Sequence, residues 1–550
     1  MLGKRINNIG RAVAACDASS TPDEATLPLE FVQSIYVKET LRDYNYNRLM
    51  KAFNNGPMVY PGAAMIQRPD GKLLRIQDAA NRPARSGAKD ISFGYGDTLF
   101  RHLQTGDRVI ICRQPSLLAN SLGSHRIKVA QDATKDTIDI SILAVSQYHA
   151  DFDGDELNSI FLQNWQSIAE ATFISAIHTR LIQDVNGKML VGQMQDSVVG
   201  GYMITRPDVE VDDVFLVRVH SNANTRFNMF KHSGQRVVSG RQVLSVIMPE
   251  ISFKGKSEFC KNTQLQKRIA FSEDLKNIDI QLGEIKSGFF DKGASEVQTT
   301  IALMQEPKNA MDTIFSIQQA ILNYNKYAGF SIGLKDILLS KESVAIIRTK
   351  NQDMMRRGAI LIDQYAKNVL SEPVGKSRWE FLQERVKDTF NNEGIDALMA
   401  SFGSDAEGFP ADVSSGVTNA LATMAITGSK GSFGNIKLMI VSIGQALNDN
   451  KPLPYLFDRR LNAFHRKNDL DPRAHGIILN SYLQGLTPSE LLANCIPERT
   501  QMLNKVLTVA KPGYMGRKMI KNLEPLMVNN VRMCRKERAI TELLFAHDGF

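Results

Sequence analysis

The chain has 550 residues, carries a formal net charge of +8, and is 43% hydrophobic and 23% charged. This length exceeds what one hydrophobic core holds, so we expect two to four domains. The composition is that of a globular protein and excludes a chain dominated by disorder. The positive charge suits a polyanionic partner, although proteins without such a partner also carry charges of this size.

The spacing of the cysteines and the composition of the N-terminus indicate in which cellular compartment the protein is found. Cys16, Cys112, Cys260, Cys495 and Cys534 lie far apart, with no Cys-x-x-Cys pair and no histidine at zinc spacing. We therefore expect no zinc in this chain and a reducing environment. The N-terminus lacks the apolar core of a signal peptide, and no apolar run approaches the ~18 residues of a membrane span. An intracellular, soluble protein without a membrane partner is expected.

Residues 1–165 are predicted to be mainly β structure. Short apolar runs, such as 108–112 and 138–145, alternate with Gly, Pro and Asp, which is typical of a compact barrel or sandwich. Basic residues gather in this region, and together they could line a phosphate-rich path, although each alone is more often a solvated charge. They are Lys4, Arg5, Arg11, Arg113, His125, Arg126 and Lys128.

Three carboxylates at alternate positions, Asp151, Asp153 and Asp155, suit a hard divalent cation such as Mg²⁺, which takes oxygen ligands. In a straight strand, side chains two residues apart would stand ~6.6 Å from each other. Two oxygens on one Mg²⁺ lie no more than ~4.2 Å apart. The segment must therefore curl, and Gly154 permits this because glycine tolerates positive φ.

Three other kinds of loop share features with this segment. An EF-hand fails, because its required Gly and Glu positions hold Glu156 and Leu162. An aspartyl phosphohydrolase of the haloacid dehalogenase type shares Asp-Phe-Asp-Gly, with the first Asp as nucleophile, but expects Thr or Val where Asp155 stands. A plain acidic turn also fits the loop taken alone.

An ordered series of motifs runs through the first part of the chain. The series consists of Gly3-Lys4-Arg5, Gly10-Arg11, Tyr44-Asn45, Gly56-Pro57, Pro61-Gly62-Ala63, Gly106-Asp107, Arg113-Gln114-Pro115-Ser116-Leu117, His125-Arg126-Ile127-Lys128-Val129 and Ala150-Asp151-Phe152-Asp153-Gly154-Asp155. In this order the motifs resemble the active-site region of the largest subunit of multi-subunit RNA polymerases. In that family the region forms a double-psi β-barrel.

The resemblance implies roles for these residues. Asp151, Asp153 and Asp155 would hold one catalytic Mg²⁺, and a second Mg²⁺ would arrive with the nucleoside triphosphate. Arg113, followed by Gln114 and Pro115, would face the sugar of the incoming nucleotide. The chain departs from the family's pattern at several positions, and Cys112, where the family has Asn, puts the detailed recognition of the ribose in doubt. The others are Leu118, Ser124 and His149.

The middle of the chain predicts two further regions. Helical patterning begins at residues 164–182, and the segments that follow, up to residue 340, are similar to the family's pore region. Residues 342–370 and 378–399 are amphipathic and are separated by a Pro-Gly stretch, which predicts an antiparallel helix pair. This pair resembles the family's funnel helices.

A Gly- and Lys-rich loop follows at residues 428–436 and contains Lys430. Such a loop suggests a phosphate cradle, but the Walker spacing is absent, so an NTPase loop is disfavoured. The segment is similar to the version found in eukaryotic, archaeal and large DNA virus polymerases. Lys430 is therefore a candidate for contact with nucleic acid.

The sequence Thr487-Pro488-Ser489-Glu490 is a capping box and predicts the start of a helix. Pro497 is expected to break this helix and to open a second one, which would run to about Glu524 and resembles the family's bridge helix. Arg499, Tyr514 and Arg517 fall on matching positions.

Pro512 predicts a kink near Thr508 in that helix. The alternative is that the helix ends at Lys511 and another begins at Tyr514. Beyond it, a basic tail either touches nucleic acid or forms a solvated helix face. The tail contains Arg532, Arg535, Lys536 and Arg538.

These elements predict an α+β multidomain protein. Its expected parts are a double-psi β-barrel active-site domain at 1–165, a mixed α/β pore domain at 166–340, funnel helices at 341–425, and a cleft region at 426–550 with a bridge helix at about 497–524. Because the resemblance starts at the barrel and stops after the bridge helix, we expect either one piece of a split subunit or a truncated one.

The resemblance implies the catalytic centre of a DNA-directed RNA polymerase that adds nucleotides to RNA 3′ ends by a two-metal reaction. It would need the second-largest subunit, a polypeptide carrying the clamp and trigger loop, and a DNA template with its RNA transcript. A large DNA virus is the expected source, which would place it in the host nucleus or cytoplasm, a viral factory or the virion. Alternatives are a non-catalytic scaffold or nucleic-acid-binding fragment, a two-barrel RNA-templated polymerase, and the phosphohydrolase.

Overall fold

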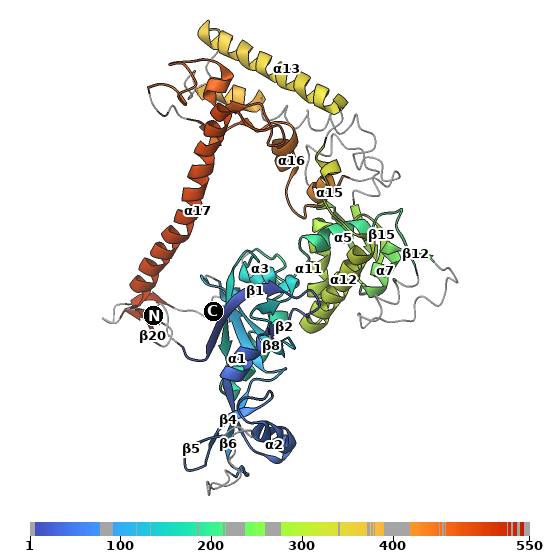
Figure 1. The fold of residues 1–550 in the computed structure, drawn as a ribbon, viewed down its shortest axis with the longest axis vertical. Coiled ribbons are helices and arrows are strands. Elements are labelled where there is room, and N and C mark those ends of the chain that lie inside the picture. The colour runs from blue at the N-terminus through green and yellow to red at the C-terminus, as the bar shows by residue number, and fades with distance from the viewer. Residues whose placement is uncertain are drawn as a thin grey trace. The chain divides into compact units, whose positions relative to one another are not determined.

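The computed structural model describes residues 6–76, 92–183 without 117 and 133, 186–212, 215, 237–258, 277–338, 341–370, 375, 378, 380–389, 419–453 without 450, 456, 458–524, 526–529, 532–535 and 540–543. These residues belong to two compact units, which are described separately (Figure 1). The barrel unit comprises Asn7–Ile332 and Pro410–Ser432, and the helical unit comprises Met1–Ile6, Gly333–Phe409 and Phe433–Phe550.

A closed six-stranded barrel lies at the centre of the barrel unit, with strand order β1-β10-β7-β8-β2-β9. Alternate side chains of each short apolar run point inward, so Leu27, Ile111 and Ile127 are fully or almost fully buried. The structure therefore has a closed barrel, one of the two compact β folds expected for this part of the chain. The strands are β1 Ile9–Cys16, β2 Glu24–Leu27, β7 Arg108–Cys112, β8 Leu122–Val129, β9 Ile138–Ile140 and β10 Glu156–Phe161, with the short helices α1 Leu29–Ser34 and α3 Val145–Tyr148.

A second sheet is inserted in the chain between β2 and β7, in the order β3-β6-β4-β5. It packs with one helix around a small core of its own, which contains Leu49, Phe53, Ile66 and Leu99. The insertion therefore has its own centre of packing beside the barrel. Its elements are β3 Tyr36–Thr40, α2 Tyr46–Asn55, β4 Ala63–Gln67, β5 Leu73–Arg75 and β6 Thr98–His102.

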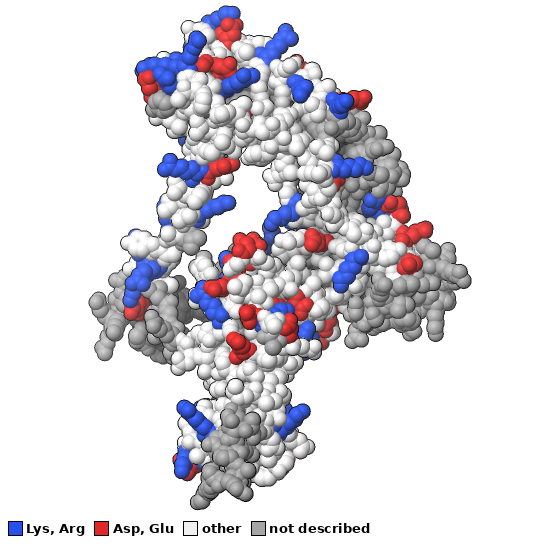
Figure 2. Space-filling view, viewed as in Figure 1, with Lys and Arg blue, Asp and Glu red and all other residues white. Residues whose placement is uncertain are grey.

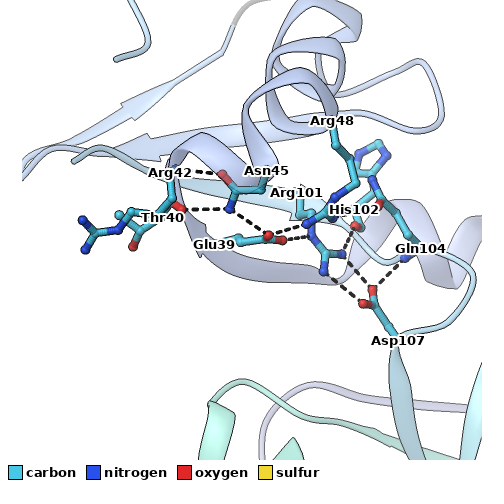
Figure 3. A network of polar contacts seen from close by, with 9 residues as sticks. All are labelled: Glu39, Thr40, Arg42, Asn45, Arg48, Arg101, His102, Gln104 and Asp107. Atoms are coloured by element: carbon cyan, nitrogen blue, oxygen red, sulfur yellow. Dashed lines mark hydrogen bonds and ion pairs between the residues drawn. The ribbon is translucent and has the colours of Figure 1, made fainter. Parts of the chain in front are cut away.

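A buried polar network joins this sheet to the barrel (Figure 3). Arg101 on β6 donates from Nε to Glu39 on β3 at 2.7 Å, and from Nη1 and Nη2 to both carboxylate oxygens of Asp107 at 2.7 and 2.9 Å. Asp107 immediately precedes β7. One guanidinium therefore fixes the sheet to the turn that leads into a barrel strand.

A mixed α/β region completes the barrel unit. It packs around an apolar core distinct from that of the barrel, in which Leu143 and Ile177 lie with Phe290, Ile314 and Ile321. The mixed character expected for residues 166–340 is confirmed. Its helices are α4 Trp165–Phe173, α5 Asp196–Ile204, α7 Gly240–Ile247, α11 Ser295–Met304, α12 Pro307–Ala328 and α15 Ala420–Thr427, and its strands are β11 Glu210–Asp212, β12 Val237–Ser239, β13 Phe253–Lys256, β14 Asn277–Gln281 and β15 Glu284–Ser287.

The helical unit is built around α13, Lys341–Ala366, and α17, Pro488–Leu523. Leu382 and Val386, from a helical stretch at 380–389, pack in one cluster with Met354 and Ile362 of α13. The first helix of the predicted pair is thus present, while residues 390–399 of the second lie outside the described residues. The other elements are α16 Phe433–Ile440, β16 Gly444–Gln445, β17 Leu447–Asn448, β18 Lys451–Pro452 and β19 Ile477–Ile478.

Helix α17 starts at the predicted capping box but does not stop where expected. Thr487 accepts a hydrogen bond from the Glu490 backbone, and Glu490 Oε2 accepts one from the Thr487 backbone at 3.0 Å. The helix then continues through Pro497 and Pro512 to Leu523. The predicted break at Pro497 is wrong, and so is the alternative that the helix ends at Lys511.

Figure 1 draws α17 as one continuous helix, and the kink near Thr508 stays a prediction. Each proline removes one hydrogen bond from a helix of 36 residues, and the many remaining bonds hold the two sides together. The basic tail is not helical. It contributes β21 Arg532–Arg535 to a three-stranded sheet with β20 Leu526–Asn529 and β22 Ile540–Leu543, while Lys536 and Arg538 lie outside the described residues.

Candidate active site

The carboxylate loop connects α3 to β10 and is curled, as predicted. His149 ends α3 in the left-handed conformation, and Gly154 has a φ of 116°. The backbone N–H of Asp151 donates to Asp155 Oδ2 at 2.8 Å, which closes the loop on itself. No atom lies within 4 Å of a Cβ built on Gly154. Glycine is therefore needed here because it tolerates the positive φ, and not because a larger side chain would clash with its neighbours.

Arg113, which directly follows strand β7, contacts this loop. Its Nε lies 2.7 Å from Asp155 Oδ2, and its Nη2 donates to Oδ1 at 3.1 Å. The contact follows from the barrel register, because β7 ends one residue before Arg113 and pairs with β10, which begins one residue after Asp155. Burial raises the pKa of Asp155, but the hydrogen bonds from Asp151 and Arg113 lower it below its ordinary value overall.

The three carboxylates differ in their surroundings. Asp151 and Asp153 are exposed, whereas Asp155 is partly covered and held by Arg113. Within the described ranges, no three His, Cys, Asp or Glu side chains are gathered as a ligand group. The donor set fits Mg²⁺ in its chemistry, since all three side chains offer hard oxygens from one short loop. Gathering these oxygens would require rotation of the exposed side chains and a new arrangement of the Asp155–Arg113 pair.

Gln114 and Pro115 follow Arg113 on the surface and are exposed beside the loop. Cys112, which precedes Arg113, is buried, and this burial raises the pKa of its thiol although a hydrogen bond with Ser116 lowers it. The thiol is therefore covered from solvent. Arg113, Gln114 and Pro115 are the groups of this turn that lie at or near the surface.

The predicted basic residues of the barrel differ in their acidic partners. Arg11 on β1 is exposed and forms an ion pair with Glu156 on β10. Arg126 donates to Asp23 at 2.8 Å, and Lys128 lies 3.7 Å from Asp17. These cations are partly neutralised by acidic neighbours. Lys4 and Arg5 lie outside the described residues.

His125 does not lie on a surface. Its side chain is fully buried, and its Nε2 lies 2.5 Å from the hydroxyl of Tyr148. Burial lowers the pKa of His125 to about 4. The expectation that it contacts nucleic acid therefore does not agree with the structure. Its side chain belongs instead to the packing that holds α3, and so the carboxylate loop, on the barrel.

The remaining candidates are exposed but belong to different units. Lys430 follows α15 in the barrel unit, whereas Arg499, Tyr514 and Arg517 lie on α17 in the helical unit. Figure 2 shows blue Lys and Arg side chains recurring along α17. Sequence reasoning missed Lys518, whose Nζ lies 4.1 Å from the centroid of the Tyr514 ring. Their separation by four residues on a helix is the signal that could have revealed this contact.

Among the described residues, no helix combines the length and the apolar character that crossing a membrane requires.

Comparison with known proteins identifies the family. Three consecutive family models match along the chain: "RNA polymerase Rpb1, domain 2" at residues 3–177, domain 3 at 180–337 and domain 4 at 362–478. Together they cover the barrel with the carboxylate loop, the mixed α/β region and part of the helical unit.

Matches to known polymerase subunits that cover the whole of this chain agree with these models. The chain is 26% identical to the DNA-directed RNA polymerase RPB1 homolog of African swine fever virus (isolate Tick/Malawi/Lil 20-1/1983), 26% to subunit Rpo1N of Thermococcus celer and 28% to RNA polymerase III subunit RPC1 of Homo sapiens. All three matches cover 100% of this chain, which spans 38%, 61% and 40% of the respective relatives. The chain therefore belongs to the family of the largest subunits of DNA-directed RNA polymerases.

Proposed function

We propose that this chain is the catalytic-centre portion of a DNA-directed RNA polymerase, which transfers nucleotides from nucleoside triphosphates to the 3′ end of RNA. The observation that carries this proposal is the curled loop with Asp151, Asp153 and Asp155 beside Arg113 on a closed barrel. This loop lies within the match to Rpb1 domain 2. The names of the relatives support the reaction class.

The carboxylate loop would hold Mg²⁺ through Asp151, Asp153 and Asp155, and a second Mg²⁺ would enter with the nucleoside triphosphate. Bound there, the metal would supply Lewis acidity that lowers the pKa of the RNA 3′-hydroxyl and offsets charge on the leaving pyrophosphate. The chain's own contribution is positional. Gly154 and the Asp151–Asp155 hydrogen bond set the curl of the loop, so that all three carboxylates project from one short segment.

Arg113 has two tasks in this proposal. Its guanidinium now offsets the charge of Asp155 through two contacts of 2.7 and 3.1 Å. Its remaining N–H groups could also donate to the sugar or phosphate of the nucleotide, because a guanidinium carries five donors. Gln114 and Pro115, which are exposed next to it, would form the adjoining wall of the nucleotide site.

The exposed cations would guide the nucleic acid backbone. Contacts between Lys or Arg and phosphates supply affinity without sequence specificity. Tyr514, held by Lys518, would offer a ring face for stacking. The proposed contacts are Lys4, Arg5, Arg11, Arg126, Lys128, Lys430, Arg499, Tyr514 and Arg517.

We assign the parts of the chain accordingly. The barrel would be the double-psi β-barrel domain at 1–165, followed by the pore domain at 166–340, funnel helices at 341–425 and a cleft region at 426–550 with α17 as bridge helix. Because the chain spans only part of its relatives, activity would require the second-largest subunit and a polypeptide supplying the clamp and trigger loop. The complex would work inside cells, and the viral relative supports a viral factory or virion as its place.

The test is nucleotide addition on a preformed DNA–RNA scaffold by the complex reconstituted with its partner subunits. Asp153→Ala should abolish Mg²⁺-dependent extension while leaving assembly of the complex intact. The matched control is Asp136→Ala, which removes another exposed carboxylate from the same barrel and should leave extension unchanged. Extension that survives Asp153→Ala would show that the metal assignment is wrong.

A second candidate is a non-catalytic scaffold that retains the motif. The pairing of Asp155 with Arg113 favours it, because one of the three carboxylates is already occupied. Mg²⁺-dependent extension by the reconstituted wild-type complex separates the two functions. A third outcome, hydrolysis of a generic phosphoester by this chain alone, would instead indicate the phosphohydrolase.

A further inference from the structure

A groove of about 740 Å³ lies in the helical unit, between α13 and the turn that precedes α17. More than half of its lining side chains are apolar, and Leu338 and Leu483 at its rim remain 62% and 47% exposed. Exposed leucines beside a groove of this volume are typical of a ligand site with an apolar component. None of the described residues that line it is acidic.

Two arginines give the groove a positive charge. Arg348 projects from α13, and Arg473 comes from the 3₁₀ turn Pro472–His475. In the part of the chain that the structure describes, neither guanidinium has an ion pair or a side-chain hydrogen bond. By contrast, the nearby Arg460 is paired with Asp458 at 3.3 Å. Two uncompensated guanidinium groups therefore face one apolar groove.

Glu490, the first acidic residue after the groove-lining residues 479–484, is already satisfied. Glu490 accepts hydrogen bonds from the Leu479 backbone at 3.1 Å, the Asn480 side chain at 2.9 Å and the Thr487 backbone at 3.0 Å. These hydrogen bonds stabilise the segment before α17, and Glu490 does not line the groove. An anion entering the groove would therefore find free donors and no carboxylate in its wall.

We propose that this groove binds an amphipathic organic anion. A carboxylate, phosphate or sulfonate head would be held by Arg348 and Arg473, because guanidinium groups match oxyanions with two parallel hydrogen bonds. The apolar body would pack against Leu338, Ile347 and Leu483, and the amide of Gln352 or Gln484 would bind polar atoms at its edge. The groove uses no residue of the carboxylate loop, so this ligand is distinct from the nucleotide of the proposed reaction.

The first experiment titrates the full chain with anilinonaphthalene sulfonate, a fluorescent probe with one sulfonate on an apolar ring body. The double variant Arg348→Gln/Arg473→Gln should bind it at least about tenfold more weakly, because hydrogen bonds to charged groups are lost. Leu483→Ser should weaken it severalfold. The control Lys350→Gln/Arg466→Gln removes the same charge from α13 and the neighbouring loop outside the groove and should bind like wild type.

A second measurement does not depend on the variants. Hydrogen exchange of the wild-type chain with and without the probe should show protection over 344–355 and 479–484. Displacement of the probe by laurate or by adenosine monophosphate supports the site and distinguishes an aliphatic from a ring-bearing ligand. The proposal is overturned if the double variant binds like wild type, if the control weakens binding equally, if protection lies only elsewhere, or if only a Glu- and Leu-rich peptide displaces the probe.

Discussion

Arg101 is a single side chain on which two acidic residues from different elements depend (Figure 3). It is only 7% exposed and bonds Glu39 and both carboxylate oxygens of Asp107. Without Arg101, Asp107 would lose this ion pair and Glu39 would keep only Arg48 and Asn45, and breaking a buried ion pair costs up to about 3–5 kcal/mol. Arg101→Gln should therefore lower the free energy of opening of the inserted sheet by up to this amount, measured by hydrogen exchange of the β3 and β6 amides.

The pH dependence gives this prediction a second readout. Burial raises the pKa of Glu39, but its contacts with Arg101, Asn45 and Arg48 lower it below the ordinary value of 4.5 overall. A group whose pKa is lowered by folding stabilises the protein above its ordinary pKa and loses this contribution as the pH falls through the lowered value. The difference between wild type and Arg101→Gln should thus be largest near neutral pH and shrink below about pH 4.5.

The control for this residue is Arg75→Gln, which removes an exposed arginine from strand β5 of the same sheet. Such surface substitutions usually change stability by no more than about 0.5 kcal/mol. A loss of stability as large as that of Arg101→Gln, or a difference that stays constant down to pH 3, would contradict the role assigned to the Arg101 ion pairs.

Helix α17 shows how local and global preferences compete within one element. Most of its residues beyond Glu498 are exposed, so the helix has few contacts with the rest of its unit to offset a local defect. Proline in a helix interior is about 3 kcal/mol less favourable than alanine. Pro512→Ala would restore an N–H that can donate to the Thr508 carbonyl. The amides around residue 512 should then exchange up to about a hundredfold more slowly.

Pro488→Ala is the matched control in the same helix. Pro488 stands at the first helical position, where its missing N–H would have no partner in the helix. Its replacement should leave exchange around residue 512 unchanged. Faster or unchanged exchange in Pro512→Ala would mean that the helix is limited by something other than its proline, such as fraying from its C-terminal end.

At the scale of the whole molecule, the sequence was informative where a feature depends on neighbours along the chain. The curl at Gly154 and the capping box at Thr487 are both local, and both were predicted. The contact of Arg113 with Asp155 depends on the pairing of β7 with β10, and the burial of His125 depends on Tyr148 from another element. Neither could be derived from periodicity, because both require the closed barrel.

At the prolines of α17, by contrast, a local rule predicted a break at Pro497 that the structure does not have. Propensity rules assign a penalty to Pro497 and Pro512, but they do not include the hydrogen bonds of the helical turns on both sides. The inserted sheet with its network around Arg101 also lay outside the predicted domain pattern, since Glu39 and Arg101 are 62 residues apart. Long-range ion pairs leave no local signature in a sequence.

The last prediction concerns the electrostatic attraction between the whole chain and nucleic acid. With a net charge of +8, it should bind a DNA duplex with an affinity that falls linearly on a log–log plot against salt, with a slope of about −0.9 per neutralised phosphate. The variant Arg11→Gln/Lys430→Gln/Arg499→Gln/Arg517→Gln should reduce this slope by up to about four units. Fluorescence anisotropy of labelled DNA at several salt concentrations measures it.

The comparison variant removes the same total charge from exposed cations that are not proposed contacts: Lys72→Gln/Arg75→Gln/Lys335→Gln/Lys350→Gln. Released counterions come only from phosphates that the protein neutralises, so this variant should keep the wild-type slope although its net charge is equally reduced. Equal slopes for both variants would mean that attraction depends on total charge alone. The nucleic acid path would then have to be sought on other residues, while the assignment of the carboxylate loop would stand on its own test.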